Sequence, residues 1–595
     1  MHPFLRVPAL SALVLLASGT QAFSQKDAVN YQKAVDYKKQ YADQEAVALD
    51  VIHDFTFSID KTTKQPMVLE EESLHLMSLR VNNNLYHLSF YNDNSRITKA
   101  ELKKDRKEVY LSTACGNYEV DNIFHSDAKV CSYRIPFEKA GDQASMYITK
   151  KYTDLRYFTT VYLPTRYPAE KREITFTVPD GIDVEIKEFN FEGYDIEKSK
   201  VYNPKAKETK HVYKASKLRP LVHENNTRGN SFVYPHLLVL TKSYVTKEGT
   251  QKLLGSTDDL YGWYSSLTRE VKNDRAVLEP LVKSLTEGKA TDEQKIKALY
   301  YWVQDNIRYI AFEAGIAGFK PEAAHEVYQK KYGDCKGMAN LTKEMLKIAG
   351  FDARLTWIGT NSIAYDYSLP SLAVDNHMVC TVFLNGRPVV LDATEKYISF
   401  NDYGERIQGR PILVEEGDKY QLLKVPVVGK ERNLISREHT QRIEGNTLIG
   451  SAKVKYNGES KTGILYSLNR SKTEKRKEIL ENFANMRDRN ITVAKVLASD
   501  LSDRENPFTL TFDFEAKNRV SVFENDMYLT IDPEQDFKNM DVEAKRVSDL
   551  YFDEKVFRKS RITLQIPEGY KVSHLPASLK RENPSFSFNI NITQQ

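Results

Sequence analysis

The spacing of apolar residues changes twice along this chain, and these changes constrain its fold more than any other feature. Over most of residues 23–245 apolar and polar side chains alternate, as in Ile174 to Val178, which predicts half-buried β-strands. Residues 246–405 show mainly helical spacing, and alternation resumes over most of residues 406–595. The sequence therefore predicts an α+β multidomain protein, with a mixed middle domain between an N-terminal β-sandwich and a C-terminal β-rich domain.

Residues 1–22 have the pattern of a secretory signal peptide. Arg6 lies in a short basic segment, residues 7–17 are apolar, and small residues precede a predicted cleavage site after Ala22. The apolar run is too short to span a bilayer, and no cysteine follows the cleavage site for lipid attachment. We therefore expect an exported protein, periplasmic or secreted, without a transmembrane segment. The strand character of the last residues leaves open whether the sequence is truncated.

Charge and motif content exclude several classes of function. The 85 basic and 81 acidic residues nearly cancel to a formal charge of +4, and no basic block is interleaved with aromatic residues, so we expect no nucleic-acid partner. The 12 histidines are scattered, and neither His-Glu-x-x-His nor Cys-x-x-Cys occurs, so we expect no metal and no cofactor. Nothing in the sequence indicates the oligomeric state.

The four cysteines are consistent with export if two of them pair. Cys115 and Cys131 both lie in the N-terminal β region, where a disulfide between them would stabilise the fold by about 3 kcal/mol. Two buried thiols are an equally good interpretation of the same residues. The pairing therefore stays open at the level of the sequence.

Cys335 lies where the sequence predicts the start of a helix. Asp334 is a typical N-cap residue, apolar residues follow at helical spacing, and Gly350 is typical of the position after a helix end. The thiol would lie beside unpaired backbone N–H groups at the positive end of the helix dipole, and Lys336 adds a positive charge. Both effects stabilise a thiolate, so we expect a nucleophile or a redox thiol rather than a small buried side chain.

A predicted hairpin downstream supplies candidate partners for this thiol. Asn385 and Gly386 form a typical two-residue turn between two strand-like segments. Pairing across this turn places His377 and Asp392 on one face as diagonal neighbours, about 7–8 Å apart, within reach of an imidazole–carboxylate hydrogen bond. Cys380 has the opposite parity to His377 and is expected to face away from it. The hairpin therefore offers an oriented base.

These residues together resemble the bacterial transglutaminase-like superfamily, which has a papain-like catalytic core. The resemblance rests on the run GDCKGMANLTKEMLKIAGFDARL around Cys335, followed by DNHMV around His377 and LDAT around Asp392. It covers about residues 290–400 and implies that the middle domain is catalytic. Less specifically, the β-rich flanks resemble those of multidomain Bacteroidetes proteins with such a core. Gly337 departs from the pattern, because many members carry an acidic residue there.

The resemblance implies cysteine acyl transfer by a catalytic triad. Cys335 would be the nucleophile, His377 the general acid and base, and Asp392 the residue that orients the imidazole. The backbone N–H of Cys335 is the natural first oxyanion donor, because it lies at a helix N-terminus. Tyr309 and Trp302 are the candidates for a second donor, although Trp302 is better interpreted as a core residue.

The group that accepts the acyl chain distinguishes two activities. Water would make the protein a peptidase or amidase, and a lysine amine would make it a protein-glutamine cross-linking transglutaminase. We favour hydrolysis of protein or peptide amides, including cell-envelope material, because nothing indicates a site for an amine substrate. Two other classes stay open: an inactive binding or adhesion protein that uses its β domains, and a redox protein that pairs Cys335 with Cys380. Tyr365, Tyr367 and Pro370 are expected to line a substrate cleft.

Overall fold

The computed structural model describes most of the chain, and the structural statements below refer to residues 25–118, 124–313, 315–532, 540, 542–543 and 546–594. The predicted signal peptide and its cleavage site after Ala22 lie outside the described residues. Within the described ranges, no helix combines the length and the apolar character needed to cross a membrane.

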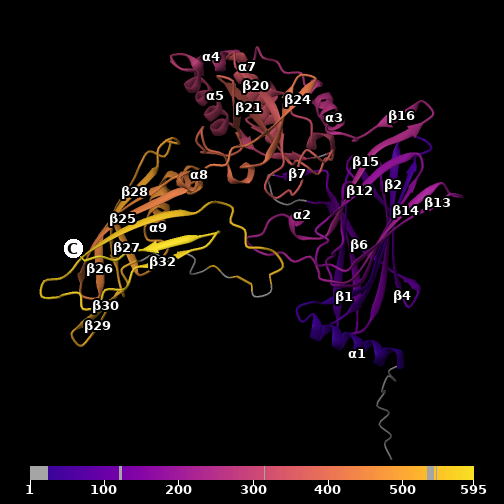
Figure 1. The fold of residues 1–595 in the computed structure, drawn as a ribbon, viewed down its shortest axis with the longest axis horizontal. Coiled ribbons are helices and arrows are strands. Elements are labelled where there is room, and N and C mark those ends of the chain that lie inside the picture. Colours follow the sequence, from indigo (N-terminus) through magenta and orange to yellow (C-terminus); the bar gives the residue numbers. More distant parts are fainter. Residues whose placement is uncertain are drawn as a thin grey trace, which may run out of the picture.

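A large sheet forms the main layer of the N-terminal region, with helix α1 (Gln25–Gln40) at one end (Figure 1). Its eight strands lie in the order β13-β14-β11-β1-β2-β9-β4-β5. Their bounds are β1 (Ala46–Ile59), β2 (Pro66–Ser78), β4 (Ser95–Lys104), β5 (Lys107–Val109), β9 (Gln143–Tyr152), β11 (Ala169–Pro179), β13 (Ile196–Asn203) and β14 (Glu208–Leu218).

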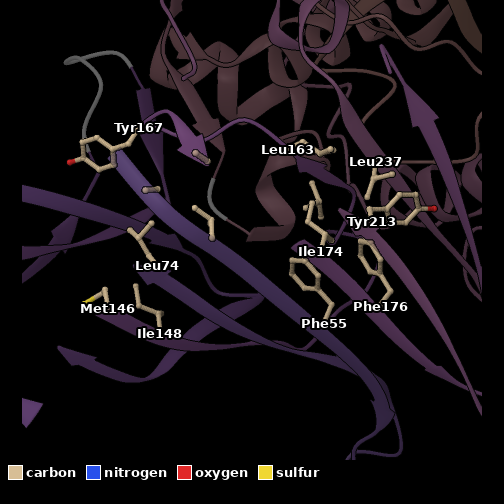
Figure 2. Close-up of a cluster of buried hydrophobic side chains, with 14 of the residues drawn as sticks. Phe55, Leu74, Met146, Ile148, Leu163, Tyr167, Ile174, Phe176, Tyr213 and Leu237 are labelled. Atoms are coloured by element: carbon tan, nitrogen blue, oxygen red, sulfur yellow. The ribbon is translucent and has the colours of Figure 1, made fainter. Parts of the chain in front are cut away.

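Two smaller sheets complete this region. One contains β3 (Asn83–Tyr91), β8 (Lys129–Phe137) and β6 (Ser112–Asn117), and the other contains β10 (Thr160–Tyr162), β15 (His236–Thr246), β12 (Ile182–Phe189) and β16 (Gly249–Lys252). Inward-facing residues of all three sheets share one hydrophobic cluster, in which Phe55, Phe176 and Leu237 lie close together (Figure 2). This cluster accounts for the alternation in strands such as β11, where the alternate residues Ile174, Phe176 and Val178 face it.

A disulfide joins Cys115 and Cys131 in the smallest of these sheets. The two cysteines lie directly opposite each other on β6 and β8. Of the two interpretations left open by the sequence, the disulfide is therefore the one adopted in the structure.

The middle region combines helices with a five-stranded sheet. The helices are α3 (Thr257–Arg269), α4 (Glu279–Thr286), α5 (Asp292–Asn306), α6 (Ala324–Lys330) and α7 (Cys335–Ile348). The sheet order is β22-β21-β20-β23-β24, with β20 (Asp352–Ile358), β21 (His377–Leu384), β22 (Arg387–Leu391), β23 (Pro411–Glu416) and β24 (Lys419–Lys424). β23 and β24 lie beyond residue 405, the expected end of the middle domain, yet they extend its sheet.

Short elements connect the middle region to its neighbours. β18 (Ala311–Glu313) pairs with β7 (Phe124–Ser126) of the N-terminal region, and β17 (Arg308–Tyr309) pairs with β19 (Tyr332–Gly333) just before α7. Single turns are α2 (Asn230–Val233), η1 (Gly315–Gly318), η2 (Glu405–Ile407) and η3 (Lys430–Asn433).

The C-terminal region is a second β-rich unit. Its main sheet has the order β27-β28-β26-β25-β31, with β25 (Leu434–Glu444), β26 (Thr447–Tyr456), β27 (Ile491–Ala498), β28 (Phe508–Ala516) and β31 (Phe557–Gln565). Helices α8 (Gly458–Arg470) and α9 (Thr473–Ala484) follow β26, and short hairpins are formed by β29 (Val520–Phe523) with β30 (Asp526–Leu529) and by β32 (Leu579–Glu582) with β33 (Ser587–Ile590). The predicted α+β multidomain class is confirmed, because β-rich regions lie on both sides of the mixed middle region (Figure 1).

Candidate active site

Helix α7 begins at Cys335, as the sequence predicts. The Asp334 side chain accepts a hydrogen bond from the Gly337 backbone N–H at 2.8 Å, which is the contact of an N-cap residue. Lys336 Nζ lies 2.5 Å from Asp334 Oδ2, and both side chains are buried. Cys335 itself is only 8% exposed. The local sequence therefore fixes the thiol in the first turn of a buried helix.

The predicted hairpin is confirmed by its register. Leu384 pairs with Arg387 across the turn, and Asn385 and Gly386 both have positive φ, as a tight two-residue turn requires. His377 is therefore the first residue of β21, and Asp392 directly follows β22.

The structure brings the three predicted site residues together. His377 Nε2 lies 2.8 Å from Asp392 Oδ2, and both side chains are buried. Cys335 and His377 lie close enough to shift each other's pKa, and Nδ1 is the ring nitrogen that is not bonded to Asp392. Cys335 comes from a helix and the other two residues come from the ends of paired strands.

Electrostatics favour a thiolate beside an imidazolium. Burial opposes ionisation of Cys335, but the charge of Lys336 and the interaction with His377 together lower the pKa of its thiol below the usual value. Burial likewise opposes a charged imidazole, yet the Asp392 carboxylate raises the pKa of His377 to about 9. Burial also opposes ionisation of Asp392. The charge of His377, and after it that of Arg406, nevertheless holds the pKa of this carboxyl well below its usual range.

Arg406 is a site residue that the sequence did not reveal. Arg406 lies in η2, and its Nη2 donates to Asp392 Oδ2 at 2.9 Å and to Thr394 Oγ1 at 2.7 Å. The same nitrogen lies 3.2 Å from His377 Nε2, and Nε donates to Glu395 Oε1 at 2.5 Å. No local pattern marks Arg406, because its role depends on a contact between separate turns of the chain.

Asp392 is held by more than its two charged partners. Its Oδ1 accepts from the Thr394 backbone N–H at 3.1 Å and from Thr394 Oγ1 at 2.6 Å. Tyr300 on α5 donates to the Asp392 backbone carbonyl at 3.0 Å. Tyr300 is therefore the buried residue that the helical spacing predicts, and it also fixes the backbone at Asp392.

The loop tyrosines expected to line a cleft are buried instead. Tyr365 and Tyr367 belong to the same hydrophobic cluster as Cys335, and the Tyr365 hydroxyl bonds to His236 Nε2 in β15. Tyr367 donates to Asp375 Oδ2 at 3.2 Å. These rings fill the contact between the middle and N-terminal regions, a tertiary role that the sequence of the loop does not indicate.

Asp375 is a buried carboxyl two residues before His377. It accepts hydrogen bonds from Tyr264 at 2.9 and 2.8 Å as well as from Tyr367, and burial raises its pKa to about 7. Tyr264 also stacks on Trp357 at 5.0 Å between ring centroids. Asp375 therefore anchors the aromatic residues that surround one side of Cys335.

The remaining candidates occupy other positions. Trp302 is half-buried and packs against Tyr328 at 5.8 Å, in agreement with its interpretation as a core residue, and Tyr309 packs on the cluster that contains Cys335. Cys380 is fully buried in a different cluster, and burial raises its pKa to about 12. Cys335 and Cys380 are both free thiols.

Gly337 has a packing explanation within this site. A Cβ at this position would lie 3.0 Å from Val327 Cγ2 on α6 and 3.7 Å from Glu322 Cβ. The close approach of α6 to α7 therefore disfavours the acidic side chain that the family resemblance leads one to expect there. Across the described ranges, no group of three or more His, Cys, Asp or Glu side chains is arranged to hold a metal ion.

Two segments match known sequence families. Residues 279–393, which contain all three clustered side chains, match the transglutaminase-like superfamily. Residues 525–595 match a domain of unknown function for which a structure has been solved. The sequence matches no curated protein.

Solved structures give weaker likenesses. A candidate protease from Parabacteroides distasonis is 12% identical with a TM-score of 0.48, over 80% of this chain and 93% of that chain. A candidate cysteine protease from Cytophaga hutchinsonii is 10% identical with a TM-score of 0.17, over 55% of this chain and 75% of that chain. A mutant M1 zinc metallopeptidase from Deinococcus radiodurans is 10% identical with a TM-score of 0.19, over 35% and 46% of the two chains. These scores carry no functional argument.

Proposed function

This chain contains a transglutaminase-like domain at residues 279–393, and we propose that it is a cysteine-dependent hydrolase of protein or peptide amides. One observation carries the proposal: a buried thiol at a helix N-terminus contacts an imidazole that is in turn bonded to a carboxylate. We assign Cys335 as nucleophile, His377 as general acid and base, and Asp392 as the orienting residue.

The first half-reaction forms an acyl-enzyme. The Cys335 thiolate attacks the amide carbonyl carbon, and the backbone N–H of Cys335 at the start of α7 stabilises the oxyanion that develops. The His377 imidazolium then donates its Nδ1 proton to the amide nitrogen, the C–N bond breaks and the amine leaves. Because the pKa of His377 is about 9, the ring carries this proton at neutral pH.

The second half-reaction returns the enzyme to its starting state. Neutral His377 takes a proton from water, and the resulting hydroxide attacks the acyl carbon. The C–S bond breaks, the acid product leaves, and the thiolate and imidazolium are restored. Asp392 keeps Nε2 protonated through both halves, so that Nδ1 always faces the reacting atoms.

Amine incorporation tests hydrolysis against transfer. The full chain is incubated with a glutamine-containing peptide and a labelled primary amine, alongside Cys335→Ala and the matched control Cys380→Ala. We expect ammonia or peptide release without incorporated amine, loss of at least 100-fold in rate for Cys335→Ala, and a near-normal rate for Cys380→Ala. Incorporation of the labelled amine would contradict the proposed hydrolysis and favour a cross-linking transglutaminase.

Thiol reactivity tests the enzyme proposal itself. At pH 6 we expect iodoacetamide to modify Cys335 at one equivalent and to leave Cys380 unmodified, because their pKa values are shifted in opposite directions. Mass spectrometry of tryptic peptides reads both sites. An unreactive Cys335 would favour an inactive binding protein, and a Cys335–Cys380 disulfide would favour a redox protein.

We also propose that the protein acts outside the cytoplasm, in the periplasm or after secretion. The predicted signal peptide and the Cys115–Cys131 disulfide support this location, because disulfides persist in oxidising compartments. Protein purified from its native host is expected to begin at Phe23. An intact Met1 end in a cytoplasmic fraction would contradict export.

A further inference from the structure

The turn that carries Arg406 receives a hydrogen bond from outside the middle region. η2 has only three residues, and Gly404 at its N-cap position has no side chain that could cap it. Glu459 lies on α8, on the side of the C-terminal region toward the middle region (Figure 1), and its Oε1 accepts from the Glu405 backbone N–H at 2.9 Å. The first N–H groups of a helical turn have no partner within the turn, so Glu459 acts as the cap of η2.

This bond lies directly beside the residue that holds the candidate triad. Glu405 precedes Arg406, whose Nη2 donates to Asp392 Oδ2 at 2.9 Å. The Arg406 backbone carbonyl in turn accepts from the Asn361 backbone N–H at 2.7 Å. Two bonds from different regions of the chain, one from Asn361 and one from Glu459, therefore fix the backbone around Arg406.

The start of α8 is itself held in place. Gly458 has a φ of +53°, and a Cβ at this position would overlap Asn433 Oδ1, so a larger residue would be strained. The Glu459 backbone N–H donates to Asn433 Oδ1 at 3.3 Å, and Asn433 Nδ2 donates to the Lys555 carbonyl at 3.2 Å. The Glu459 side chain therefore extends toward η2 from a fixed point of the C-terminal region.

The C-terminal region also contacts the segment that joins Asp392 to η2. Tyr397, within this segment, packs on the hydrophobic cluster of the C-terminal region. The Arg504 guanidinium lies 5.2 Å from the centroid of the Tyr397 ring and bonds to Asp305 on α5. The C-terminal region therefore supports this segment at more than one point.

The bond to η2 needs an oxygen atom of Glu459 rather than its charge. Burial, together with the nearby carboxylates of Glu395, Glu554 and Glu405, raises the pKa of Glu459 to about 7. Burial likewise raises the pKa of Glu405 to about 7. Whether or not it is protonated, the Glu459 carboxyl keeps an oxygen that accepts from an N–H group, and the amide of a glutamine would supply the same acceptor.

We infer that Glu459 is a positioning residue of the Cys335 site, through which the docked C-terminal region holds Arg406 against Asp392. The inference rests on the proposed hydrolysis for its effect on rate, but its effect on the His377 imidazole needs no substrate. Burial and then the charge of Arg406 act to lower the pKa of His377, against the opposite effect of Asp392. A guanidinium that is held less firmly therefore lets the pKa of His377 rise.

Substitutions of the acceptor and of the donor test this role on the full chain. Glu459→Ala removes the acceptor, Glu459→Gln keeps it, and Glu478→Ala, at an exposed position of α9, is the matched control. Glu405→Pro removes the N–H, whereas Glu405→Ala keeps it. Proline suits the first residue of η2, because Gly404 before it has an extended backbone with φ −55° and ψ 139°.

Two measurements are made on each variant. One is kcat/KM against pH with a glutamine-containing peptide, and the other is the titration of His377 by NMR of isotope-labelled histidine, with His377→Gln as the assignment control. We expect Glu459→Ala to lower the maximum of kcat/KM by about fivefold and to raise the pKa of His377, in the same direction as Arg406→Gln. Glu459→Gln and Glu478→Ala should keep the native values.

Two further comparisons identify the route of the effect. Glu405→Pro should reproduce the losses of Glu459→Ala relative to Glu405→Ala, because the two substitutions remove opposite ends of one bond. Glu459→Ala combined with Arg406→Gln should lose no more activity than Arg406→Gln alone, since both act on the same contact with Asp392.

Three outcomes would overturn the role of Glu459. They are a native pKa of His377 in Glu459→Ala, a change as large in Glu459→Gln as in Glu459→Ala, and additive losses in the double variant with Arg406→Gln. If the native protein does not hydrolyse the peptide, the proposed function fails and the His377 titration alone decides this inference. If Glu459→Ala lowers the thermal midpoint by more than about 5 °C, the comparison of Glu405→Pro with Glu405→Ala decides.

Discussion

Arg406 adds a positive charge to a cluster that already holds one imidazole and one carboxylate. It binds Asp392 and Glu395, and its Nη2 lies 3.2 Å from His377 Nε2. The guanidinium steadies the carboxylate that orients the imidazole, and its charge lowers the pKa of His377 against the larger, opposite effect of Asp392. We therefore assign Arg406 as a positioning residue whose charge also moves the alkaline limit of the site to lower pH.

Arg406→Gln is expected to weaken activity and to widen its range toward alkaline pH. Without the guanidinium the pKa of His377 rises, so the alkaline limb of kcat/KM moves to higher pH while its maximum falls by about tenfold, or about 1.4 kcal/mol. A pH–rate profile measures both effects. Arg387→Gln, at an exposed position of β22, is the control. A lower maximum with an unmoved alkaline limb would reduce Arg406 to a purely structural role.

Asp375 should make the stability of the fold depend on pH. Burial raises its folded pKa to about 7, above the usual value of 3.8, so the folded state prefers the protonated carboxyl. This contribution is complete below about pH 4 and is lost as pH rises through about 7, by on the order of 4 kcal/mol. Asp375→Asn should flatten the decline of the unfolding free energy between pH 4 and 8.

Urea unfolding at a series of pH values tests this expectation, with Asp418→Asn as an exposed control. A slope as steep in Asp375→Asn as in the native protein would show that other groups carry the pH dependence.

At the scale of elements, Asp334 at the start of α7 has two separate effects on the site, one on the helix and one on the thiol. Asp334 caps the helix and pairs with Lys336, but its negative charge also raises the pKa of the adjacent Cys335 thiol. The capping contact needs only a side-chain oxygen, whereas the electrostatic effect needs the charge. The two effects can therefore be separated by substitution.

Asp334→Asn should keep the cap and lower the pKa of Cys335 further, because asparagine is an equally good N-cap residue without the charge. Asp334→Ala should in addition lower the unfolding free energy by about 1 kcal/mol. Thiolate absorbance at 240 nm against pH, with Cys335→Ala as the blank, reads the pKa. A higher pKa of the Cys335 thiol in Asp334→Asn than in the native protein would mean that Lys336 needs Asp334 to remain charged.

Elements defined by neighbouring residues could be predicted from the sequence, and elements defined by distant contacts could not. The Asp334 cap and the Asn385–Gly386 turn are local, so the helix start and the hairpin register followed from spacing alone. The pairing of β23 with β20 and the burial of Tyr365 against His236 join separate segments of the chain, and no local pattern encodes them. Arg406 could not be predicted from the sequence for the same reason, because its contact with Asp392 joins separate turns of the chain.

At the scale of the whole molecule, a short segment of the C-terminal region contacts both other regions. Glu224 of the N-terminal region accepts hydrogen bonds from the backbone N–H of Val547 at 2.6 Å and of Ser548 at 2.9 Å. Tyr551 donates its backbone N–H to the Asn226 carbonyl at 2.7 Å, and its hydroxyl accepts from Asn361 Nδ2 of the middle region at 3.0 Å. Residues 546–551 therefore tie the three regions together.

Glu224→Ala should release this segment without altering the Cys335 site. Glu224 is buried, so its removal leaves the backbone N–H groups of Val547 and Ser548 without their acceptor, at a cost of about 1–3 kcal/mol each. Chymotrypsin should then cleave at Tyr551 and Phe552 at least tenfold faster, while the iodoacetamide rate of Cys335 stays unchanged. Glu192→Ala, at an exposed position of the same region, should cleave at the native rate. Equal cleavage rates in the two variants would show that Glu224 does not hold the segment. A lower iodoacetamide rate of Cys335 in Glu224→Ala would show that the docked segment also supports the thiol site.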